Sequence, residues 1–293
     1  MIRELYRTIL PEVVRKYLWT LRFKKLRADI IRYLRKKSRN GDEECQRILT
    51  FLEAHKDLHI VFPYDFTEKY SASNISVFHD ETGFPYVLHN GKKLYGKKKW
   101  TDSQFAEYYC GLLLEQDEES PHRYLFPNRM PQKDIVIADV GAAEGIFTLD
   151  VLPCIQKAYL FECDKEWIEA LHLTFKEEIA GDVVEIVEAF VGSEDNAGKN
   201  TVRLDSFFAD KRIDYIKADI EGAEEAMIAG GESVFSQKVQ TVLLCCYHKQ
   251  NAEDIFKQYL VKKGFSHIEV NQKWMIFVYQ EETLRAPYLR HGV

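Results

Sequence analysis

The chain has 293 residues, of which 46% are apolar and 29% charged, and its formal net charge is −6. A chain of this length can bury a large core, and its glycines and prolines are dispersed without a repeat, which excludes collagen-like, disordered and solenoid proteins. The six cysteines include no C-x-x-C pair and no run approaches 18 apolar residues, so we expect a reduced, cytoplasmic protein without a zinc ribbon, a secretory leader or a membrane span.

Residues 2–38 have the periodicity of an amphipathic helix that is interrupted at Pro11. Within residues 1–40, 13 Lys and Arg outnumber three acidic residues, so the other 253 residues carry a net charge of −16. An acidic body does not fit a protein that follows a phosphate backbone, and we expect no nucleic-acid partner. The basic helix predicts either a helical subdomain packed on this body or a peripheral membrane contact through residues 1–40.

A second helix is predicted over residues 43–55, after which the periodicity changes to that of short strands. These runs are 75–79, 85–89 and 92–95. Asn90-Gly91 supplies the positive φ angles of a tight hairpin turn, so we expect a small antiparallel meander. Thr101 and Gln104 then have the spacing of a capping box and predict a helix that runs to about Glu118.

The polar segment 120–124 follows that helix and contains a histidine, an arginine and a tyrosine. Together with Glu115 and Gln116 it either ends the helix or lines a binding pocket, and the Pro121 stop favours the first interpretation.

From residue 133 onward, predicted strands and helices alternate. The strands are 135–139, 158–162, 183–189, 214–219 and 241–247, and the helices are 145–152, 165–179, 223–230 and 252–263. Continuously apolar strands that alternate with helices predict an α/β sheet covered on both faces. Two last runs, 267–270 and 274–279, are separated by three residues and predict an antiparallel hairpin at the end of the sheet.

We therefore divide the chain into three parts. They are a basic helical N-terminal region (1–60), a small β-meander with its lead-in helix (61–125) and an α/β domain (126–293).

Ligands of such sheets bind beyond the carboxyl ends of the strands, where the strand order reverses. The first strand leads into Asp139–Gly145, whose small residues let the backbone approach a ligand. The turn is not G-x-G-x-x-G, because Ala143 and Ile146 occupy the second and third glycine positions. Glu162 ends the second strand, 17 residues beyond Gly145, and its carboxylate can accept hydrogen bonds from two ribose hydroxyls.

Charged residues also end the fourth predicted strand, and they are Lys217, Asp219, Glu221 and Glu224. A buried charge requires a partner or a function. The fifth strand delivers His248 to the same edge of the sheet. A histidine in this place is either a structural hydrogen-bonding residue or part of a site, and its acidic neighbours favour the site.

Several of these segments together resemble the FkbM family of S-adenosylmethionine-dependent O-methyltransferases. The segments are Asp139–Gly145, Phe161-Glu162, Leu204-Asp205, Ile216–Glu224 and the strand that ends in His248. The resemblance spans about residues 133–280 and implies a Rossmann-like, seven-stranded class I methyltransferase sheet, parallel with an antiparallel C-terminal hairpin. The chain departs from the family at Ala143, Cys163 and Cys246, where the family usually has Asn, Pro and Glu.

The resemblance implies S-adenosylmethionine as the cofactor and a hydroxyl of a small molecule or carbohydrate as the methyl acceptor. The implied cofactor-binding residues are Asp139, Gly141, Ala142 and Gly145 for the methionine end, Glu162 for the ribose, and Ala189 and Phe190 for the adenine. From its strand-end placement we hypothesise that His248 is the general base, oriented by Asp219 or Glu221, with Lys217 compensating charge. No metal-ligand spacing stands out, so we expect no metal.

Two other functions remain open at this point. A nicotinamide-dependent oxidoreductase would need the G-x-G-x-x-G turn that this chain lacks. A cofactor-binding module without catalysis is favoured by Ala143 and Cys246, whereas Glu162, Asp219 and His248 argue against it.

Overall fold

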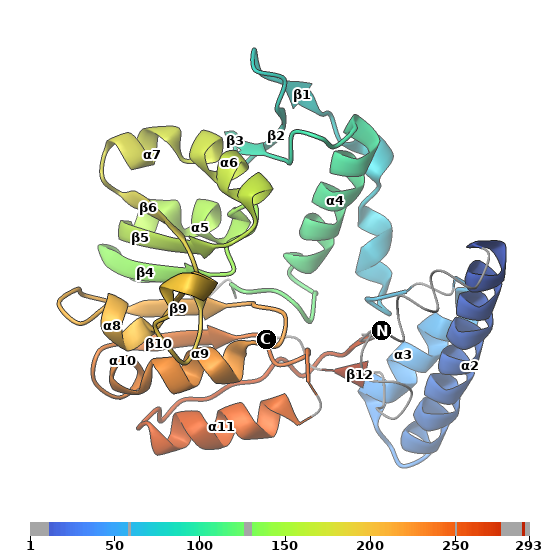
Figure 1. Cartoon of the computed structure of the whole chain (residues 1–293). Coiled ribbons are helices and arrows are strands. Elements are labelled where there is room, and N and C mark those ends of the chain that lie inside the picture. The colour runs from blue at the N-terminus through green and yellow to red at the C-terminus, as the bar shows by residue number, and fades with distance from the viewer. Residues whose placement is uncertain (1–11, 58–59, 126–130, 250, 277–288, 291–293) are drawn as a thin grey trace.

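The computed structural model describes residues 12–57, 60–125, 131–249, 251–276 and 289–290 (Figure 1). The described part begins with two packed helices, α2 (Glu12–Ser38) and α3 (Glu43–Ala54). Leu26, Ile30 and Leu34 form the buried stripe of α2, at the spacing of one helix face. The helix predicted over residues 2–38 is confirmed from Glu12 onward, and residues 1–11 lie outside the described part.

The predicted meander is confirmed as an antiparallel sheet of β1 (Phe78–His79), β2 (Pro85–His89) and β3 (Lys92–Tyr95). Its second turn has φ angles of 51° at Asn90 and 82° at Gly91, as a tight hairpin requires. Two short 3-10 helices precede the meander, η1 (Asp65–Lys69) and η2 (Ala72–Asn74).

Helix α4 (Asp102–Glu115) follows the meander, and the predicted capping box opens it. The Thr101 side chain accepts from the backbone N–H of Gln104, and the Gln104 side chain accepts from the backbone N–H of Thr101. Figure 1 shows α4 between the helix pair α2 and α3 and the main sheet, so the helix links the N-terminal region to the α/β part.

Within the described residues the main sheet has five strands, all of them parallel. They are β4 (Ile135–Val140), β5 (Ile155–Glu162), β6 (Val184–Glu188), β9 (Tyr215–Ala218) and β10 (Thr241–Leu244). Their order is β10-β9-β4-β5-β6. From β4 the chain adds β5 and β6 on one side of the sheet, and it then adds β9 and β10 on the other side of β4. The strand order therefore reverses between β4 and β9, as in a Rossmann-like sheet.

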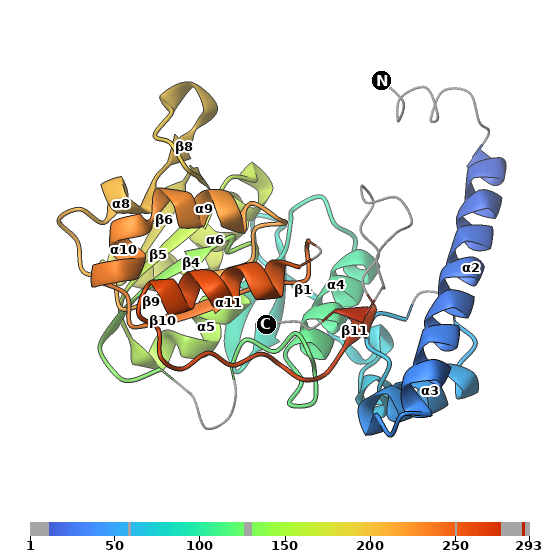
Figure 2. The ribbon, with the colours of Figure 1, turned by 90° about the horizontal axis from the view of Figure 1, so that it is seen from below.

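Helices cover both faces of this sheet (Figure 2). They are α5 (Ile146–Val151), α6 (Lys165–Thr174), α7 (Lys176–Ala180), α8 (Leu204–Phe207), α9 (Glu224–Gly230), α10 (Glu232–Gln237) and α11 (Ala252–Lys262), with the short η3 (Leu152–Cys154), η4 (Ala197–Lys199) and the strand pair β7 (Phe190–Val191) and β8 (Thr201–Val202). Ile137 packs in the core with α5 and α6, whereas its neighbours Val136 and Ala138 pack in the core with α8 to α11. The alternation of a strand therefore separates two hydrophobic cores.

The C-terminal hairpin that we predicted does not form in the described part of the chain. Residues 267–270 form no strand, and β11 (Met275–Ile276) pairs instead with β12 (Leu289–Arg290) in a separate sheet. The outer edge of β10 opens onto a cavity of about 620 Å³. Ile268 and Val270 are the apolar residues of the predicted strand 267–270, and neither is fully buried. The run therefore gains little from packing its apolar side chains against the sheet. The sheet thus has five strands here rather than seven, and residues 277–279 of the prediction lie outside the described part.

Candidate active site

A strained turn joins β4 to α5 at the point where the strand order reverses. Gly141, Ala143 and Gly145 have positive φ angles of 74°, 47° and 87°. A Cβ atom on Gly141 would lie 2.1 Å from the carbonyl oxygen of Asp219, and one on Gly145 would lie 2.6 Å from the Phe175 ring. Both positions therefore require glycine, and the turn lies directly against the residue that follows β9.

Glu162 closes the other side of this turn. One of its carboxylate oxygens accepts from the Ala143 N–H at 2.9 Å, and the other accepts from the N–H groups of Cys163 and Asp164 at 2.7 and 2.8 Å. A carboxylate offers about four acceptor positions, so three N–H donors leave room for a further hydroxyl. The side chain is 9% exposed, at the carboxyl end of β5.

Asp139 and Lys217 lie beneath the turn, withdrawn from solvent. Asp139 accepts from the Thr148 hydroxyl at 2.8 Å, and its other oxygen is 3.0 Å from the Lys217 ammonium, which also donates to the Gly141 carbonyl at 2.8 Å. Burial alone would lower the pKa of Lys217, but the charges of Asp139 and Asp219 outweigh it and raise the pKa above its usual value. The ion pair supports the turn through the contact of Lys217 with the Gly141 carbonyl. Lys217 therefore compensates mainly the charge of Asp139.

The remaining implied cofactor residues line the same edge of the sheet. Ala142 is buried and donates its N–H to the Phe161 carbonyl at 3.1 Å. Ala189 follows β6 and is half-buried, and Phe190, next in the chain, is 55% exposed. An exposed aromatic ring beyond the third strand of the domain is available to a planar ligand.

Asp219 collects hydrogen bonds from residues that are distant in sequence. The Tyr124 hydroxyl donates to it at 2.7 Å, the Tyr247 hydroxyl donates at 3.0 Å, and Nε2 of His122 lies 3.6 Å away. Burial would raise the pKa of Asp219, but the hydrogen bond and charge of His122 and the charges of Lys217 and His248 hold it well below its usual value. Asp219 is therefore an ionised acceptor at the centre of the cluster.

His248 lies close to Asp219 and Glu221, as its place at the end of the strand predicted, and also to Glu224. Its Nε2 is 3.5 Å from Asp219 and 3.7 Å from Glu221, and its Nδ1 is 3.0 Å from Glu224. Burial would lower the pKa of His248, but the hydrogen bond to Glu224 and the surrounding carboxylates raise it above its usual value. The ring is held in one orientation and is a stronger base than a free imidazole.

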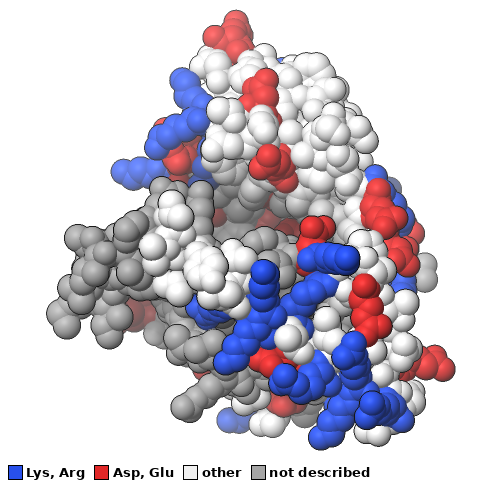
Figure 3. Space-filling model, turned by 90° about the vertical axis from the view of Figure 1, so that its right-hand side faces the viewer, with Lys and Arg blue, Asp and Glu red and all other residues white. Residues whose placement is uncertain are grey.

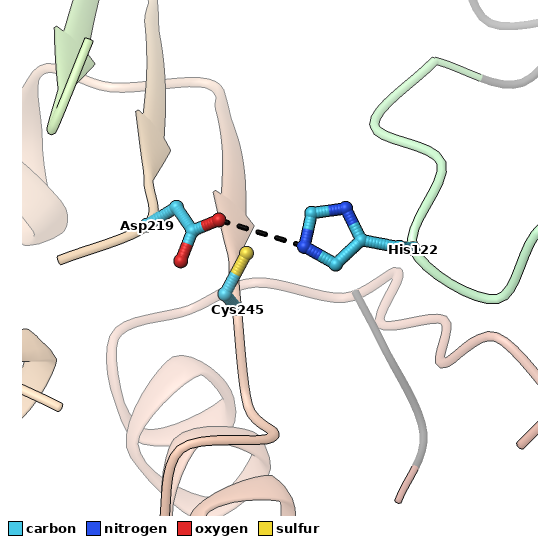
Figure 4. A group of neighbouring side chains, drawn as sticks. All are labelled: His122, Asp219 and Cys245. Atoms are coloured by element: carbon cyan, nitrogen blue, oxygen red, sulfur yellow. Dashed lines mark ion pairs between the residues drawn. The ribbon is translucent and has the colours of Figure 1, made fainter. Parts of the chain in front are cut away.

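Two groups of side chains in the described part have the spacing of metal ligands. They are His122, Asp219 and Cys245, drawn in Figure 4, and Asp219, Glu224 and His248, each with three ligand atoms within 4.8 Å of one another. The expectation of no metal rested on spacing in the sequence, which cannot detect ligands brought together by the fold. In this structure the histidines and carboxylates of both groups form ion pairs with one another, including the His122–Asp219 pair in Figure 4.

Sequence reasoning missed one buried acid and underrated one segment. Glu144, within the turn, accepts a hydrogen bond from Tyr108 of α4, and burial raises its pKa to about 7. His122 and Tyr124 belong to the polar segment that was interpreted as a helix end, yet both reach Asp219. The glycine turn itself was the available signal for Glu144, whereas nothing local could reveal the contacts across the fold.

Residues 181–276 match the family model of the methyltransferase FkbM domain. This segment of the chain is similar to the FkbM methyltransferase domain. The match runs from just before β6 to β11, so the FkbM segment includes Asp219, Glu221 and His248 and leaves the glycine turn and Glu162 upstream of it. The resemblance inferred from the sequence is confirmed over this range.

Solved structures of methyltransferases also resemble the chain. A methyltransferase FkbM from Methylobacillus flagellatus is 15% identical, with 55% of this chain and 48% of that chain covered and a TM-score of 0.42. The match thus spans about half of that protein's length. A precorrin-6y C5,15-methyltransferase from Geobacter metallireducens is 18% identical, with 48% and 68% covered and a TM-score of 0.34. An rRNA methylase from Streptococcus thermophilus is 11% identical, with 47% and 74% covered and a TM-score of 0.33. No curated protein matches the sequence.

Proposed function

We propose that the protein transfers a methyl group from S-adenosylmethionine to a hydroxyl of a small metabolite or glycan. The match of residues 181–276 to the FkbM domain supports methyl transfer. The observation that carries the site is the Gly141–Gly145 turn, which touches Glu162 on one side and Asp219 on the other. The donor and acceptor sites would therefore meet at the point of strand-order reversal.

The residues at the turn fit the proposed cofactor. Gly141 packs directly against the carbonyl of Asp219, which holds the turn close to the residues after β9, and the acceptor position left on Glu162 suits a ribose hydroxyl. Ala189 and Phe190 lie beyond the neighbouring strand, where an adenine ring would extend. Asp139 and Lys217 would act through the turn that they support. When bound, adenosylmethionine supplies an activated methyl group with its leaving group attached, so this chain must orient the acceptor and take its proton.

His248 is the residue to which we assign that proton. Its ring is oriented by Asp219 and Glu224, with Glu221 also near Nε2, and the raised pKa strengthens it as a base. The hydroxyls of Tyr124 and Tyr247 and the imidazole of His122 surround the same carboxylate. Polar groups of this kind suit an acceptor with several hydroxyls, such as a sugar or a polyhydroxylated metabolite.

We further propose a reducing, cytoplasmic setting, which the six cysteines support because all of them are free thiols.

Incubation with methyl-labelled adenosylmethionine and a panel of sugars and hydroxylated metabolites tests the proposed activity. We expect label in one class of acceptor, recovered as an O-methyl product, with stoichiometric release of adenosylhomocysteine. Label recovered only on nitrogen or carbon would contradict O-methylation. Fluorescence quenching by a nicotinamide dinucleotide and not by adenosylmethionine would favour an oxidoreductase, and binding without turnover would favour a module without catalysis.

A further inference from the structure

The N-terminal half of α2 carries an exposed apolar stripe. Its large side chains are 39% to 79% exposed, and they are Val13, Val14, Tyr17, Leu18 and Leu21. At about 100° per residue they lie within one arc of roughly 140°, on the opposite side of the helix from the buried Leu26, Ile30 and Leu34. Figure 2 shows this half of α2 extending beyond α3 and standing apart from the main sheet. The stripe is therefore not explained by the core of the protein.

The same face of the helix becomes basic toward its C-terminus. The exposed charged residues of α2 within the same arc are Lys24, Lys25, Arg32, Arg35 and Lys36. Lys24, Lys25 and Lys36 form no ion pair with any residue that the structure describes, whereas Arg32 pairs with Asp29 and Arg35 pairs with Glu53, each at 2.8 Å. Figure 3 shows Lys and Arg gathered on the side of the molecule that α2 forms. One face of α2 therefore carries exposed apolar side chains in its N-terminal half and exposed basic side chains further along.

We propose that this face of α2 binds an anionic lipid surface, with the helix lying along the membrane. Apolar side chains that enter the headgroup boundary beside lysines that meet lipid phosphates are the two contacts of an interfacial helix. The net charge of +10 over residues 1–40 is complementary to such a surface. None of the described helices has the length and hydropathy of a membrane-spanning segment.

Vesicle flotation of the full chain tests this proposal. With phosphatidylcholine vesicles that contain phosphatidylglycerol we expect binding, and with phosphatidylcholine alone we expect binding weaker by about tenfold or more. The pair Leu18→Glu with Leu21→Glu removes the apolar contact, and Lys24→Gln with Lys25→Gln removes the charge. Each pair should weaken binding to the anionic vesicles by about tenfold or more, without changing the thermal unfolding of the protein.

Matched controls lie elsewhere on the surface. Leu88 of β2 and Val261 of α11 are 55% and 63% exposed, and Leu88→Glu with Val261→Glu should leave vesicle binding unchanged. Light scattering without lipid measures whether the protein is a monomer or a dimer. It therefore tests whether a second copy of the chain, instead of a membrane, covers the apolar stripe. The proposal would be overturned if the native protein did not bind anionic vesicles, or if the control variants lost as much vesicle binding as the α2 variants. It would also be overturned if the native protein were a dimer and only the α2 variants were monomers.

Discussion

The ammonium of Lys217 lies 3.0 Å from a carboxylate oxygen of Asp139, and both side chains are buried at the junction of β9 and β4. The same ammonium donates to the carbonyl of Gly141. One lysine thus ties the strand that precedes Asp219 to the turn that would hold the cofactor. The two halves of the proposed site depend on this ion pair for their relative position.

We predict that Lys217→Met lowers the free energy of unfolding by about 3–5 kcal/mol, because it leaves the Asp139 carboxylate buried without its partner. Lys217→Met combined with Asp139→Asn should recover part of that loss. Lys249 forms a surface pair with Glu225, and Lys249→Met should cost less than about 1 kcal/mol. Denaturant titration measures all three, and equal losses for Lys217→Met and Lys249→Met would contradict this role.

Ala143 has a φ of 47°, in the left-handed region that disfavours a side chain with a Cβ atom. We predict that Ala143→Gly raises the free energy of unfolding by about 0.5–1 kcal/mol, since the strain that it relieves exceeds the entropy that glycine loses on folding. Ala143→Asn should also stabilise the turn. Ala142→Gly is the matched control, because Ala142 is buried without a positive φ, and it should destabilise. Thermal unfolding in which both glycine variants lose stability would show that the turn carries no such strain.

The pH dependence of turnover tests the assignment of His248 as the base. Its pKa lies above the usual value because Glu224, Asp219 and Glu221 outweigh burial. Turnover should therefore rise with pH as the ring loses its proton. Glu224→Gln removes one carboxylate, so the pKa of the ring falls and the rising limb should move to lower pH by about one unit or more.

His248→Gln should reduce kcat by about 10²–10⁴-fold. Glu225→Gln is the matched control for Glu224, because Glu225 is exposed and pairs with Lys249, and its pH profile should follow that of the native protein. If the Glu224→Gln profile does not move, or His248→Gln keeps near-native turnover, the proton is taken by another group.

Chelation tests whether either of the two groups of potential metal ligands around Asp219 holds a metal ion that turnover requires. We predict that treatment with EDTA leaves turnover unchanged, because Nε2 of His122 and the carboxylate of Asp219 already form hydrogen bonds and an ion pair with each other and with the tyrosines beside them. Elemental analysis of the purified protein should find less than a stoichiometric amount of zinc. Loss of turnover that added zinc or magnesium restores would instead assign a metal to this cluster.

The strands of the main sheet could be predicted because each is rich in apolar residues and alternates with a helix, and β4 and β9 formed within one residue of the predicted limits. The hairpin turn at Asn90-Gly91 could be predicted because only a few dipeptides adopt its backbone angles. The run 267–270 was predicted as a strand on its alternation alone, and with no buried side chain it does not pair with β10.

The candidate site was predictable only where it follows the ends of strands. Gly141, Glu162, Asp219 and His248 meet at one edge because parallel strands place their carboxyl ends together. Tyr124 lies 95 residues before Asp219, and the contact between them depends on where α4 docks. No local pattern encodes that position, so the aromatic side chains around Asp219 could be found only in the folded molecule.

Calorimetric titration with adenosylmethionine tests the central claim most directly, in the native protein and in Glu162→Gln. We predict saturable binding of one molecule per chain, competition by adenosylhomocysteine, and an affinity at least about tenfold lower in Glu162→Gln, equivalent to about 1.4 kcal/mol. Glu188 ends the neighbouring strand β6 and is exposed, so Glu188→Gln should bind like the native protein. No heat of binding in the native protein, or equal affinity in Glu162→Gln and Glu188→Gln, would contradict a cofactor site at this turn.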